Sequence, residues 1–407
     1  MADNQFTSKF KESTAENSVD LGKKFVTKSY LMDVYPYLTT VGSVKFSGLW
    51  TWGDNLYGGL GDNTLTDKSS PIQTIAGGTN WKQVACGSSH TVAIKTDGTL
   101  WNWGGNGLGP LADSTITHRS SPIQTITGGT NWKQVACGFA HTAAIKTDGT
   151  LWTWGTNAYG QLADNTFTPK SSPVQTIAGG TNWKQVSGGN VNTMAIKTDG
   201  TLWLWGQNTN GQLGDNTIVP KSSPVQTIAG GTNWSQVACG YTHTAAIKTD
   251  GTLWNWGNNT SGNLGDSTNT NKSSPVQTIT GGTNWKQVSA GYRHTMAIKT
   301  DGTLWLWGQN TNGQLGDSTI TSNSSPVQTI AGGTNWKQVA CGYRSIAAIK
   351  TDGTLWTWGY NFNGGLGDST ITHRSSPIQT IAGGTNWKQV AGGQYHTTAI
   401  QENGDDF

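Results

Sequence analysis

Short runs in which apolar and polar residues alternate recur through most of the chain, separated by Gly, Asp, Asn and Ser. In one stretch these runs occupy residues 131–138, 141–146, 150–155 and 171–177. Alternation with period two, rich in β-branched and aromatic residues and bounded by turn residues, predicts β-strands. Asp148 and Gly149, between the second and third runs, form a strong hairpin signal, and we attribute the Asp to its tolerance of positive φ. The pattern therefore predicts antiparallel sheets of four strands.

Tryptophan repeats with a fixed period along the chain. Three series of seven, each spaced 51 residues apart, account for all 21 tryptophans: Trp50, Trp101, Trp152, Trp203, Trp254, Trp305 and Trp356; Trp52, Trp103, Trp154, Trp205, Trp256, Trp307 and Trp358; and Trp81, Trp132, Trp183, Trp234, Trp285, Trp336 and Trp387. Trp50 and Trp52 share one face of their strand, which suits burial between neighbouring sheets. Seven such units over residues 48–404 predict an all-β fold, a seven-bladed β-propeller.

The two ends of the repeat region are complementary. After the turn Asn403-Gly404 the register requires a Trp-x-Trp strand, but the sequence stops three residues later, and the matching strand stands at residues 48–53. We expect that strand to complete the last blade and close the ring, which removes open sheet edges. The predicted organisation is an N-terminal arm, residues 1–47, followed by the propeller, residues 48–407.

Composition narrows the class of protein. Only 12% of the residues are charged, against about 25% in an average soluble chain, and the net charge is +3. This charge is too small for a polybasic nucleic-acid binder, and no apolar run is long enough for a membrane helix. The N-terminal residues lack the apolar core of a secretory signal. We therefore expect no nucleic-acid partner and no membrane insertion.

Three short motifs carry a resemblance to a known family. They are Cys239-Gly240-x-x-His243-Thr244, Asp250-Gly251-x-Leu253-Trp254-x-Trp256-Gly257 and Gly211-Gln212-Leu213-Gly214. In spacing and residue type, and in all seven units, the chain resembles the regulator-of-chromosome-condensation repeat family. This resemblance implies a seven-bladed propeller over residues 48–404. It also implies the functions of the namesake members, which exchange nucleotide on a Ran-type GTPase and bind chromatin. Those members carry a wedge insertion and a basic tail, and this chain has neither.

Carboxylates occupy fixed positions of the repeat. Nearly every Asp of the repeats lies either in the Asp-Gly turn or in one series: Asp62, Asp113, Asp164, Asp215, Asp266, Asp317 and Asp368. Carboxylates on separate blades do not form the close pairs used in acid–base catalysis. We therefore predict that the protein is not an enzyme and needs no cofactor. The Asp62 series is interpreted as bonding backbone amides of its own loop.

Histidine and cysteine also recur in register. His90, His141, His243, His294 and His396 suggest a ring of metal ligands near a propeller axis, but we favour imidazoles bonded within their own blades and predict no metal. The cysteines share a position that Gly or Ala fills in the other repeats: Cys86, Cys137, Cys239 and Cys341. They are interpreted as buried small side chains, too far apart for disulfides.

Differences between repeats concentrate in the loop after the first strand and in the segment after the Trp-Gly pair. In an antiparallel four-stranded blade both connections leave from the same end, so these residues should share one face. A strand hidden in the long third connection would reverse that placement for the residues after it. Tyr and Arg, which are enriched at binding hot spots, gather in these segments, although unconstrained drift of loops is the alternative explanation. The candidate partner-binding residues are Tyr57, Arg119, Phe139, Tyr159, Tyr241, Tyr292, Arg293, Tyr343, Arg344, Tyr360, Phe362, Arg374 and Tyr395.

The N-terminal arm differs in composition from the repeats, because it holds half of the Phe residues and no Trp. Residues 23–35 predict a short helix that ends before Pro36. An assembly or docking segment and a simple strap packed on the propeller are the two interpretations. The candidate assembly residues are Phe6, Phe10, Phe25, Tyr30 and Tyr35.

Low charge, near-identical repeats and a separable arm favour a non-enzymatic binding or structural propeller. By analogy we predict a bacteriophage-type virion accessory component of the tail or capsid. Its arm would anchor it or self-assemble, and its variable face would recognise a protein or surface-glycan receptor. The expected location is a virion or an extracellular surface, with a cytoplasmic location left open. An autonomous protein-binding or inhibitor propeller is the alternative, and nucleotide exchange on a Ran-type GTPase is the least favoured.

Overall fold

The computed structural model describes residues 18–20, 25–27, 46–75, 78 and 80–403. The chain divides into two compact units, residues 47–402 and residues 1–46 with 403–407. In the second unit β1 (Ser18–Asp20) pairs antiparallel with β2 (Phe25–Thr27). The predicted helix over residues 23–35 is therefore wrong at β2, where the β-branched Val26 and Thr27 favour an extended chain. No helix in the described ranges could span a membrane.

The propeller consists of four-stranded antiparallel sheets. Its strands are β3 (Phe46–Gly53), β4 (Lys68–Gln73), β5 (Trp81–Cys86), β6 (His90–Lys95), β7 (Leu100–Gly104), β8 (Arg119–Gln124), β9 (Trp132–Cys137), β10 (His141–Lys146), β11 (Leu151–Gly155), β12 (Lys170–Gln175), β13 (Trp183–Gly188), β14 (Asn192–Lys197), β15 (Leu202–Gly206), β16 (Lys221–Gln226), β17 (Trp234–Cys239), β18 (His243–Lys248), β19 (Leu253–Gly257), β20 (Lys272–Gln277), β21 (Trp285–Ala290), β22 (His294–Lys299), β23 (Leu304–Gly308), β24 (Asn323–Gln328), β25 (Trp336–Cys341), β26 (Ser345–Lys350), β27 (Leu355–Gly359), β28 (Arg374–Gln379), β29 (Trp387–Gly392) and β30 (His396–Asn403). Seven sheets of four strands confirm the predicted seven-bladed propeller.

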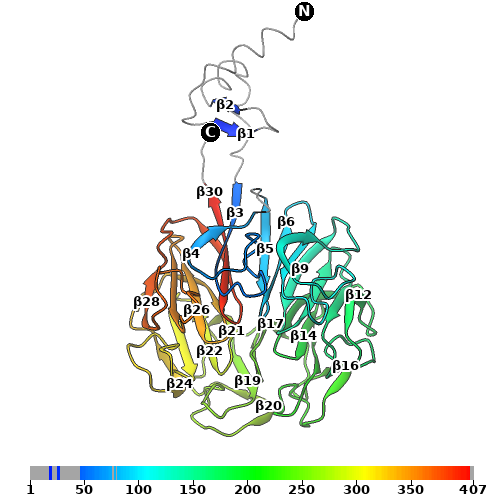
Figure 1. Cartoon of the computed structure of the whole chain (residues 1–407). Coiled ribbons are helices and arrows are strands. Elements are labelled where there is room, and N and C mark those ends of the chain that lie inside the picture. The colour runs from blue at the N-terminus through cyan, green and yellow to red at the C-terminus, as the bar shows by residue number, and fades with distance from the viewer. Residues whose placement is uncertain (1–17, 21–24, 28–45, 76–77, 79, 404–407) are drawn as a thin grey trace, which may run out of the picture. The chain divides into compact units, whose positions relative to one another are not determined.

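The ring closes within one blade. Its strand order is β29-β30-β3-β4, so two strands come from each end of the repeat region, and the blue and red strands lie side by side in Figure 1. The interface between the closing blade and the next blade has the same glutamine contact as an interface between two internal blades. Gln389 accepts a hydrogen bond from Val84 N at 3.1 Å, just as Gln83 accepts one from Val135 N at 3.1 Å between two internal blades. Closure by N- and C-terminal strands is confirmed.

The hydrophobic core lies between successive blades. Trp205 is fully buried and packs with Trp183 and with Ile145 and Leu151 of the preceding blade. Its indole N–H donates to Gln161 O of that blade at 2.8 Å. Trp203, two residues earlier, is only partly buried and contacts Lys197, whose Nζ lies 4.7 Å from the ring centroid. The two indoles therefore share a face, as predicted, but only the second is enclosed.

The outermost strand of every blade carries a proline at its fourth position, as Pro173 does in β12. These prolines are Pro71, Pro122, Pro173, Pro224, Pro275, Pro326 and Pro377. Proline cannot donate a ladder hydrogen bond, so it blunts the free edge that a fourth strand presents to other chains. The repeat thus protects every outer edge by the same device.

The hairpin between the second and third strands differs in detail from the prediction. Positive φ is adopted by Gly98 (φ +80°) and not by Asp97. The Asp97 carboxylate instead accepts hydrogen bonds from Thr99 N at 2.9 Å and Thr99 Oγ at 2.7 Å. Asp is used here as a local hydrogen-bond acceptor, so the attribution to positive φ is wrong for this residue.

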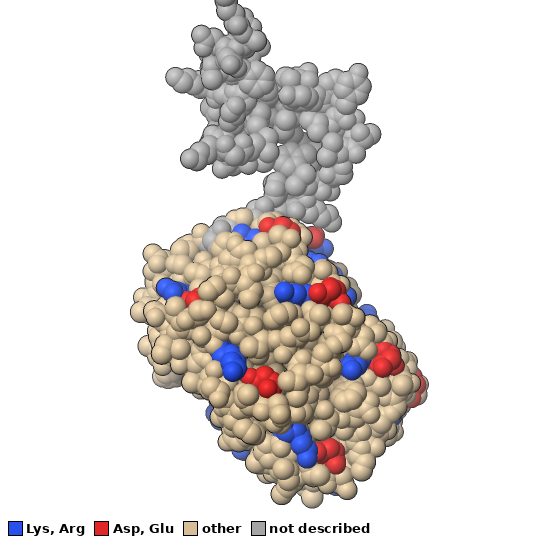
Figure 2. Space-filling model, turned by 90° about the vertical axis from the view of Figure 1, so that its right-hand side faces the viewer, with Lys and Arg blue, Asp and Glu red and all other residues tan. Residues whose placement is uncertain are grey.

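The carboxylates of the Asp62 series form their hydrogen bonds and ion pairs within their own repeats. Asp62 Oδ1 accepts from Thr64 N and Asn55 Nδ2, both at 3.0 Å, which confirms the interpretation of this series. Lys68 lies 3.7 Å from the same carboxylate. Figure 2 shows one face of the molecule, on which each cation lies beside an anion and these pairs are spaced apart on an otherwise uncharged surface.

Candidate partner-binding face

The loops that vary between repeats share one end of the propeller, hereafter the variable face. Residues 105–118, which connect β7 to β8, contain no strand, so the strand parity assumed for the prediction holds. The two connections of a blade are also bonded to each other, since Gly105 N donates to Ser89 O at 2.8 Å. Equivalent bonds join Gln309 to Arg293 and Tyr360 to Arg344. The prediction that these loops leave from the same end is confirmed.

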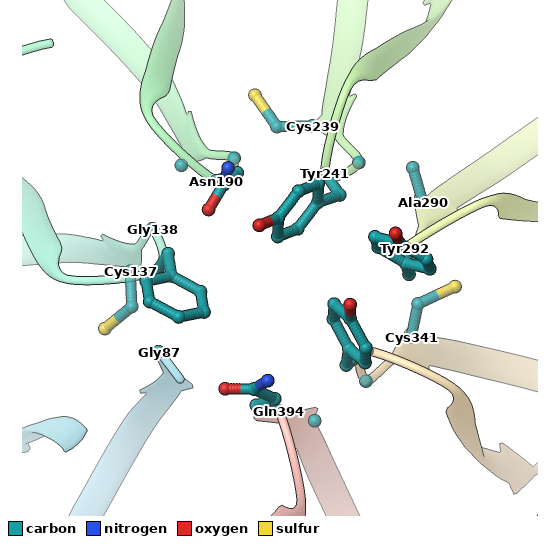
Figure 3. A pocket seen from close by; sticks show the side chains of 18 of the residues that line it. Gly87, Cys137, Gly138, Asn190, Cys239, Tyr241, Ala290, Tyr292, Cys341 and Gln394 are labelled. Atoms are coloured by element: carbon teal, nitrogen blue, oxygen red, sulfur yellow. The ribbon is translucent and has the colours of Figure 1, made fainter. Parts of the chain in front are cut away.

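An axial pocket of about 220 Å³ opens where the innermost strands of the blades converge. Each innermost strand runs into a glycine, and the next residue reaches the axis: Ser88, Phe139, Asn190, Tyr241, Tyr292, Tyr343 and Gln394. Figure 3 shows Asn190, Tyr241, Tyr292 and Gln394 projecting from different blades toward a common centre. Going toward the axis, each blade therefore lines the pocket with a small residue that is Cys, Ala or Gly, then an invariant Gly, then a residue that varies between blades.

Backbone bonds between blades hold this mouth rigid. Tyr292 N donates to Tyr343 O at 3.0 Å, Tyr343 N to Gly393 O at 3.0 Å, and Gln394 N to Gly87 O at 3.2 Å. The last bond joins the blade that closes the ring to the blade that begins with β5. Side chains at the mouth are thus presented on a fixed frame, which lowers the entropy lost when a partner binds.

Glycine is required at these positions by close packing. A Cβ on Gly240 would overlap the His243 ring and lie 2.8 Å from Gly291 O of the next blade. We expect Gly240→Ala to lower the free energy of unfolding by about 3 kcal/mol, because backbone on both sides must move. Chemical denaturation followed by tryptophan fluorescence measures the change.

Gly230→Ala is the matched control for that substitution. Gly230 has φ +52° but no atom within 4 Å of an added Cβ, so the expected cost is only about 1 kcal/mol of backbone strain. Equal losses in the two variants would contradict the steric explanation.

The histidines that recur in register form a circle around the propeller axis, directly behind the glycines that line the pocket. His141 Nε2 is 2.9 Å from Thr193 Oγ and His243 Nε2 is 2.8 Å from Thr295 Oγ, in each case on the next blade. The predicted bond within the same blade is therefore wrong, because the strand starts face the neighbouring sheet across a narrow axis. Burial lowers the pKa of His243 to about 3, with a contribution from His294, and burial lowers that of His141 to about 4.

The cysteines line the pocket wall without facing its centre. All four are free thiols, and the sulfur atoms of Cys137, Cys239 and Cys341 point away from the axis in Figure 3. Burial raises the pKa of Cys86 and Cys239 to about 12, which keeps them protonated. The described residues contain no group of three or more His, Cys, Asp or Glu placed to hold a metal ion.

Aromatic and arginine side chains gather on one sector of the variable face. We call this group the axial cluster; it comprises Tyr241, Tyr292, Arg293, Tyr343, Arg344 and Tyr395. The Tyr292 and Tyr343 ring centroids are 4.2 Å apart and tilted by 33°, and Tyr241 meets Tyr292 edge-on at 4.8 Å. Burial and then contact with Tyr292 raise the pKa of Tyr343. The Tyr343 hydroxyl therefore stays protonated and uncharged.

Other predicted residues extend this cluster or lie apart from it. Tyr360 contacts Tyr395 at 5.6 Å and His373 at 4.8 Å, and Phe139 meets Tyr241 at 6.4 Å. Elsewhere on the loops, Tyr57 contacts His118 at 4.9 Å. Tyr159 and Phe362 are exposed.

Arg119 and Arg374 are placed differently from the other candidates. Each begins the outermost strand of its blade and forms an ion pair within its own repeat. Arg119 donates from Nε and Nη2 to Asp113 Oδ2 at 2.9 and 2.8 Å, and Arg374 donates to Asp368 Oδ2 at 2.8 and 2.7 Å. Lysine stands at the corresponding position of four other blades, so these arginines serve the loop.

Sequence reasoning missed a second feature of the variable face. A groove of about 490 Å³ is lined by Asp54, Leu56, Tyr57, Leu108 and Tyr395, among others. The available signal was that Asp54 and Asp67 depart from the fixed Asp registers. Asn363 of the neighbouring blade donates to both carboxylates, at 3.5 and 3.3 Å. Burial, and then the charge of Asp67, raise the pKa of Asp54.

Of the candidate assembly residues of the arm, Phe6, Phe10, Tyr30 and Tyr35 lie outside the described residues, and of Phe25 only the backbone, in β2, is described. Their assignment stays a prediction.

Comparison with known proteins is consistent with this geometry. The profile of the RCC1-like domain matches residues 170–407, and a profile of the Regulator of chromosome condensation (RCC1) repeat matches residues 48–94 and 97–145. The Ultraviolet-B receptor UVR8 of Arabidopsis thaliana is 33% identical over 341 residues, which cover 80% of this chain and 76% of the receptor. The E3 ubiquitin-protein ligase HERC2 of Homo sapiens is 29% identical over 66% of this chain, but the match spans only 6% of the ligase.

Solved structures share the fold. Human WBSCR16 has a TM-score of 0.77 at 20% identity, covering 87% of this chain and 98% of that one. Prp20p from Saccharomyces cerevisiae, a protein with binding properties to Gsp1p and histones, has a TM-score of 0.78 at 18% identity, covering 89% and 93%. At these identities the likeness establishes the architecture alone.

Proposed function

The chain belongs to the regulator-of-chromosome-condensation (RCC1) repeat family, and on that premise we propose that it is a non-enzymatic protein-binding propeller whose variable face recognises the partner. The observation that carries the proposal is the axial cluster. It concentrates tyrosine rings and two arginines at the mouth of a rigid axial pocket. Tyr and Arg dominate binding hot spots because they offer large contact area and directional donors. The binding of Gsp1p and histones by Prp20p, which shares the fold, also supports it.

A quadruple variant tests the proposal. Replacing Tyr292, Arg293, Tyr343 and Arg344 together by Ala should abolish affinity capture of the partner by the immobilised full chain. These side chains are partly exposed, and the backbone bonds of Tyr292 and Tyr343 to the next blade survive the substitution. Circular dichroism and thermal unfolding should therefore stay close to those of the unsubstituted chain.

Arg119→Lys with Arg374→Lys is the matched control. It removes the same number of arginines, but Lys forms the loop ion pair in other blades, so capture should be unchanged. Capture that survives the quadruple variant would place the binding surface elsewhere.

The more specific hypothesis, a virion accessory component anchored by its arm, stays a proposal. It draws support from the division of the chain, in which residues 1–46 belong to a unit separate from the propeller. Sedimentation of the full chain beside residues 48–407 distinguishes the two roles. Assembly of the full chain but not of the shortened one would favour a particle component. Two monomers would favour an autonomous binding module.

A further inference from the structure

We propose that the partner bound by the variable face presents an acidic segment, with a carboxylate between Arg293 and Arg344 and an adjacent apolar side chain on the tyrosine rings. This inference rests on the proposed function and names the chemistry of its partner. It follows from two observations on these arginines: they contact tyrosine rings, and they form no ion pair with a described carboxylate.

The two arginines have no anionic partner within the described part of the chain. Arg119 and Arg374 pair with aspartates of their own loops, whereas Arg293 and Arg344 form no such pair with any described carboxylate. The Nε–H of Arg344 is closed off from solvent and donates to no described acceptor. Because that atom is enclosed, a partner carboxylate would meet the outer N–H donors of the partly exposed guanidinium, which two carboxylate oxygens satisfy best.

Stacking on tyrosine holds both guanidinium groups in place. Arg293 Cζ lies 5.0 Å from the Tyr292 ring centroid, and Arg344 Cζ lies 5.3 Å from the same centroid. Arg344 also lies 5.4 Å from the Tyr343 centroid. Stacking on a ring uses the face of a guanidinium and leaves its in-plane N–H donors available. Two cations from adjacent blades therefore lie within 5.3 Å of the centroid of one tyrosine ring.

The tyrosine rings provide the apolar half of the site. Tyr241, Tyr292 and Tyr343 contact one another at centroid distances of 4.2 to 5.7 Å beside the axial pocket. A surface of packed rings with two cations at its edge matches an acidic residue next to an aromatic or aliphatic one.

The carboxylates of Asp54 and Asp67, on the other side of Tyr395 from the arginines, limit where a negatively charged group can bind. Asp54 N donates to Tyr395 O at 3.0 Å, so this acidic pair borders the cluster and repels a segment that is acidic throughout. A basic segment is less favoured as the occupant, because Asp67 already accepts from Asn55 N at 2.8 Å and from Asn363. The arginines lack such partners.

Selection from a random peptide display library on the immobilised full chain tests the proposal. Clones that also bind the Arg293→Ala, Arg344→Ala double variant are removed. We expect the remaining clones to share an Asp or Glu beside an aromatic or aliphatic residue. One synthetic peptide from that set should bind at least about tenfold more weakly to either Arg→Lys single variant, because Lys lacks the planar fork. The Arg119→Lys, Arg374→Lys chain should bind it normally.

Charge dependence gives a second readout on the same peptide. Its affinity should fall several-fold between about 50 mM and about 500 mM salt. Affinity should also be lost when its acidic residues become the corresponding amides.

The other outcomes are distinct from one another. Clones without acidic residues that still require Tyr292 and Tyr343 would overturn this inference and leave the proposed function standing. If no clone remained after this removal, and the removed clones also bound the quadruple variant, binding would be independent of the whole cluster and would count against both. Arginine-dependent binding of a short oligothymidylate would replace the acidic segment by a nucleic acid. A dimer in sedimentation that both Asp54→Asn and Arg344→Ala dissociate would make the occupant a second copy of this chain.

Discussion

Lowering the pH from 7 to 5 should reduce the free energy of unfolding by roughly 10 kcal/mol, about 2 kcal/mol for each of five buried histidines. These imidazoles are neutral in the folded protein, where burial lowers their pKa to about 3 or 4. In the unfolded chain their pKa is about 6.5. Below that pH the unfolded state binds protons that the folded state does not, so stability falls as pH falls. Urea denaturation at several pH values between 7 and 5 measures the effect.

The chain supplies its own control for this prediction. Blade β13-β14-β15-β16 carries Asn192 at the position where five other blades have His and the remaining blade has Ser345, so His243→Asn tests the same position with a side chain the fold already accepts. The unfolding free energy of this variant should depend on pH with a slope about one fifth smaller, because unfolding then takes up protons on four histidines and not five. This change in slope is independent of the variant's stability at pH 7. Lowered pKa values of turn aspartates such as Asp97 act below this window, because an unfolded Asp titrates near 3.9. A flat profile between pH 7 and 5 would contradict the burial of the imidazole ring.

Trp205→Ala should lower the free energy of unfolding by about 3–5 kcal/mol. The substitution empties space between two blades, where the indole is fully buried against Trp183 at a centroid distance of 6.3 Å. It also removes one of the two hydrogen bonds that Gln161 O accepts, leaving only the one from Thr193 Oγ. Thermal and urea unfolding, monitored by circular dichroism, measure the loss.

Trp203→Ala provides the comparison within the same strand. This indole is partly buried, and its N–H bonds to Thr201 Oγ of its own hairpin at 2.9 Å. Its removal should cost about 1–2 kcal/mol, from lost packing and from the lost contact with Lys197. If the two variants were equally destabilised, the core would not lie between the blades in the way the contacts indicate.

The architecture could be predicted from the sequence because the same pattern of strands and turns occurs in every repeat. A 51-residue tryptophan period, an Asp-Gly turn in each unit and a missing last strand predict blade number, strand order and closure. What the pattern does not encode is the angle between blades. His141 was therefore expected to bond within its own blade and in fact reaches Thr193 of the next. Similarly, whether a glycine such as Gly240 is required depends on how close the neighbouring backbone comes.

The candidate site was predictable as a face but not as a cluster. Strand parity placed the variable loops together, yet it could not separate Arg293 from Arg119. The six-residue spacing of Asp113 and Arg119, with Lys replacing Arg in other repeats, was the signal for an ion pair within the loop. Contacts such as Tyr292 with Tyr343 depend on the width of the axial mouth, which is a property of the assembled ring.

Closure by strands from both ends has a consequence for synthesis. Trp52 of β3 donates to Gly365 O, 313 positions further along the chain, and β3 gains its inner neighbour only when β30 has been made. At about 5–20 residues per second, ribosomes take roughly 18–70 s to go from β3 to β30. Throughout this interval β3, which carries two indoles, has an unpaired edge on the nascent chain. Translation speed therefore sets how long that edge is open to chaperones or to mispairing.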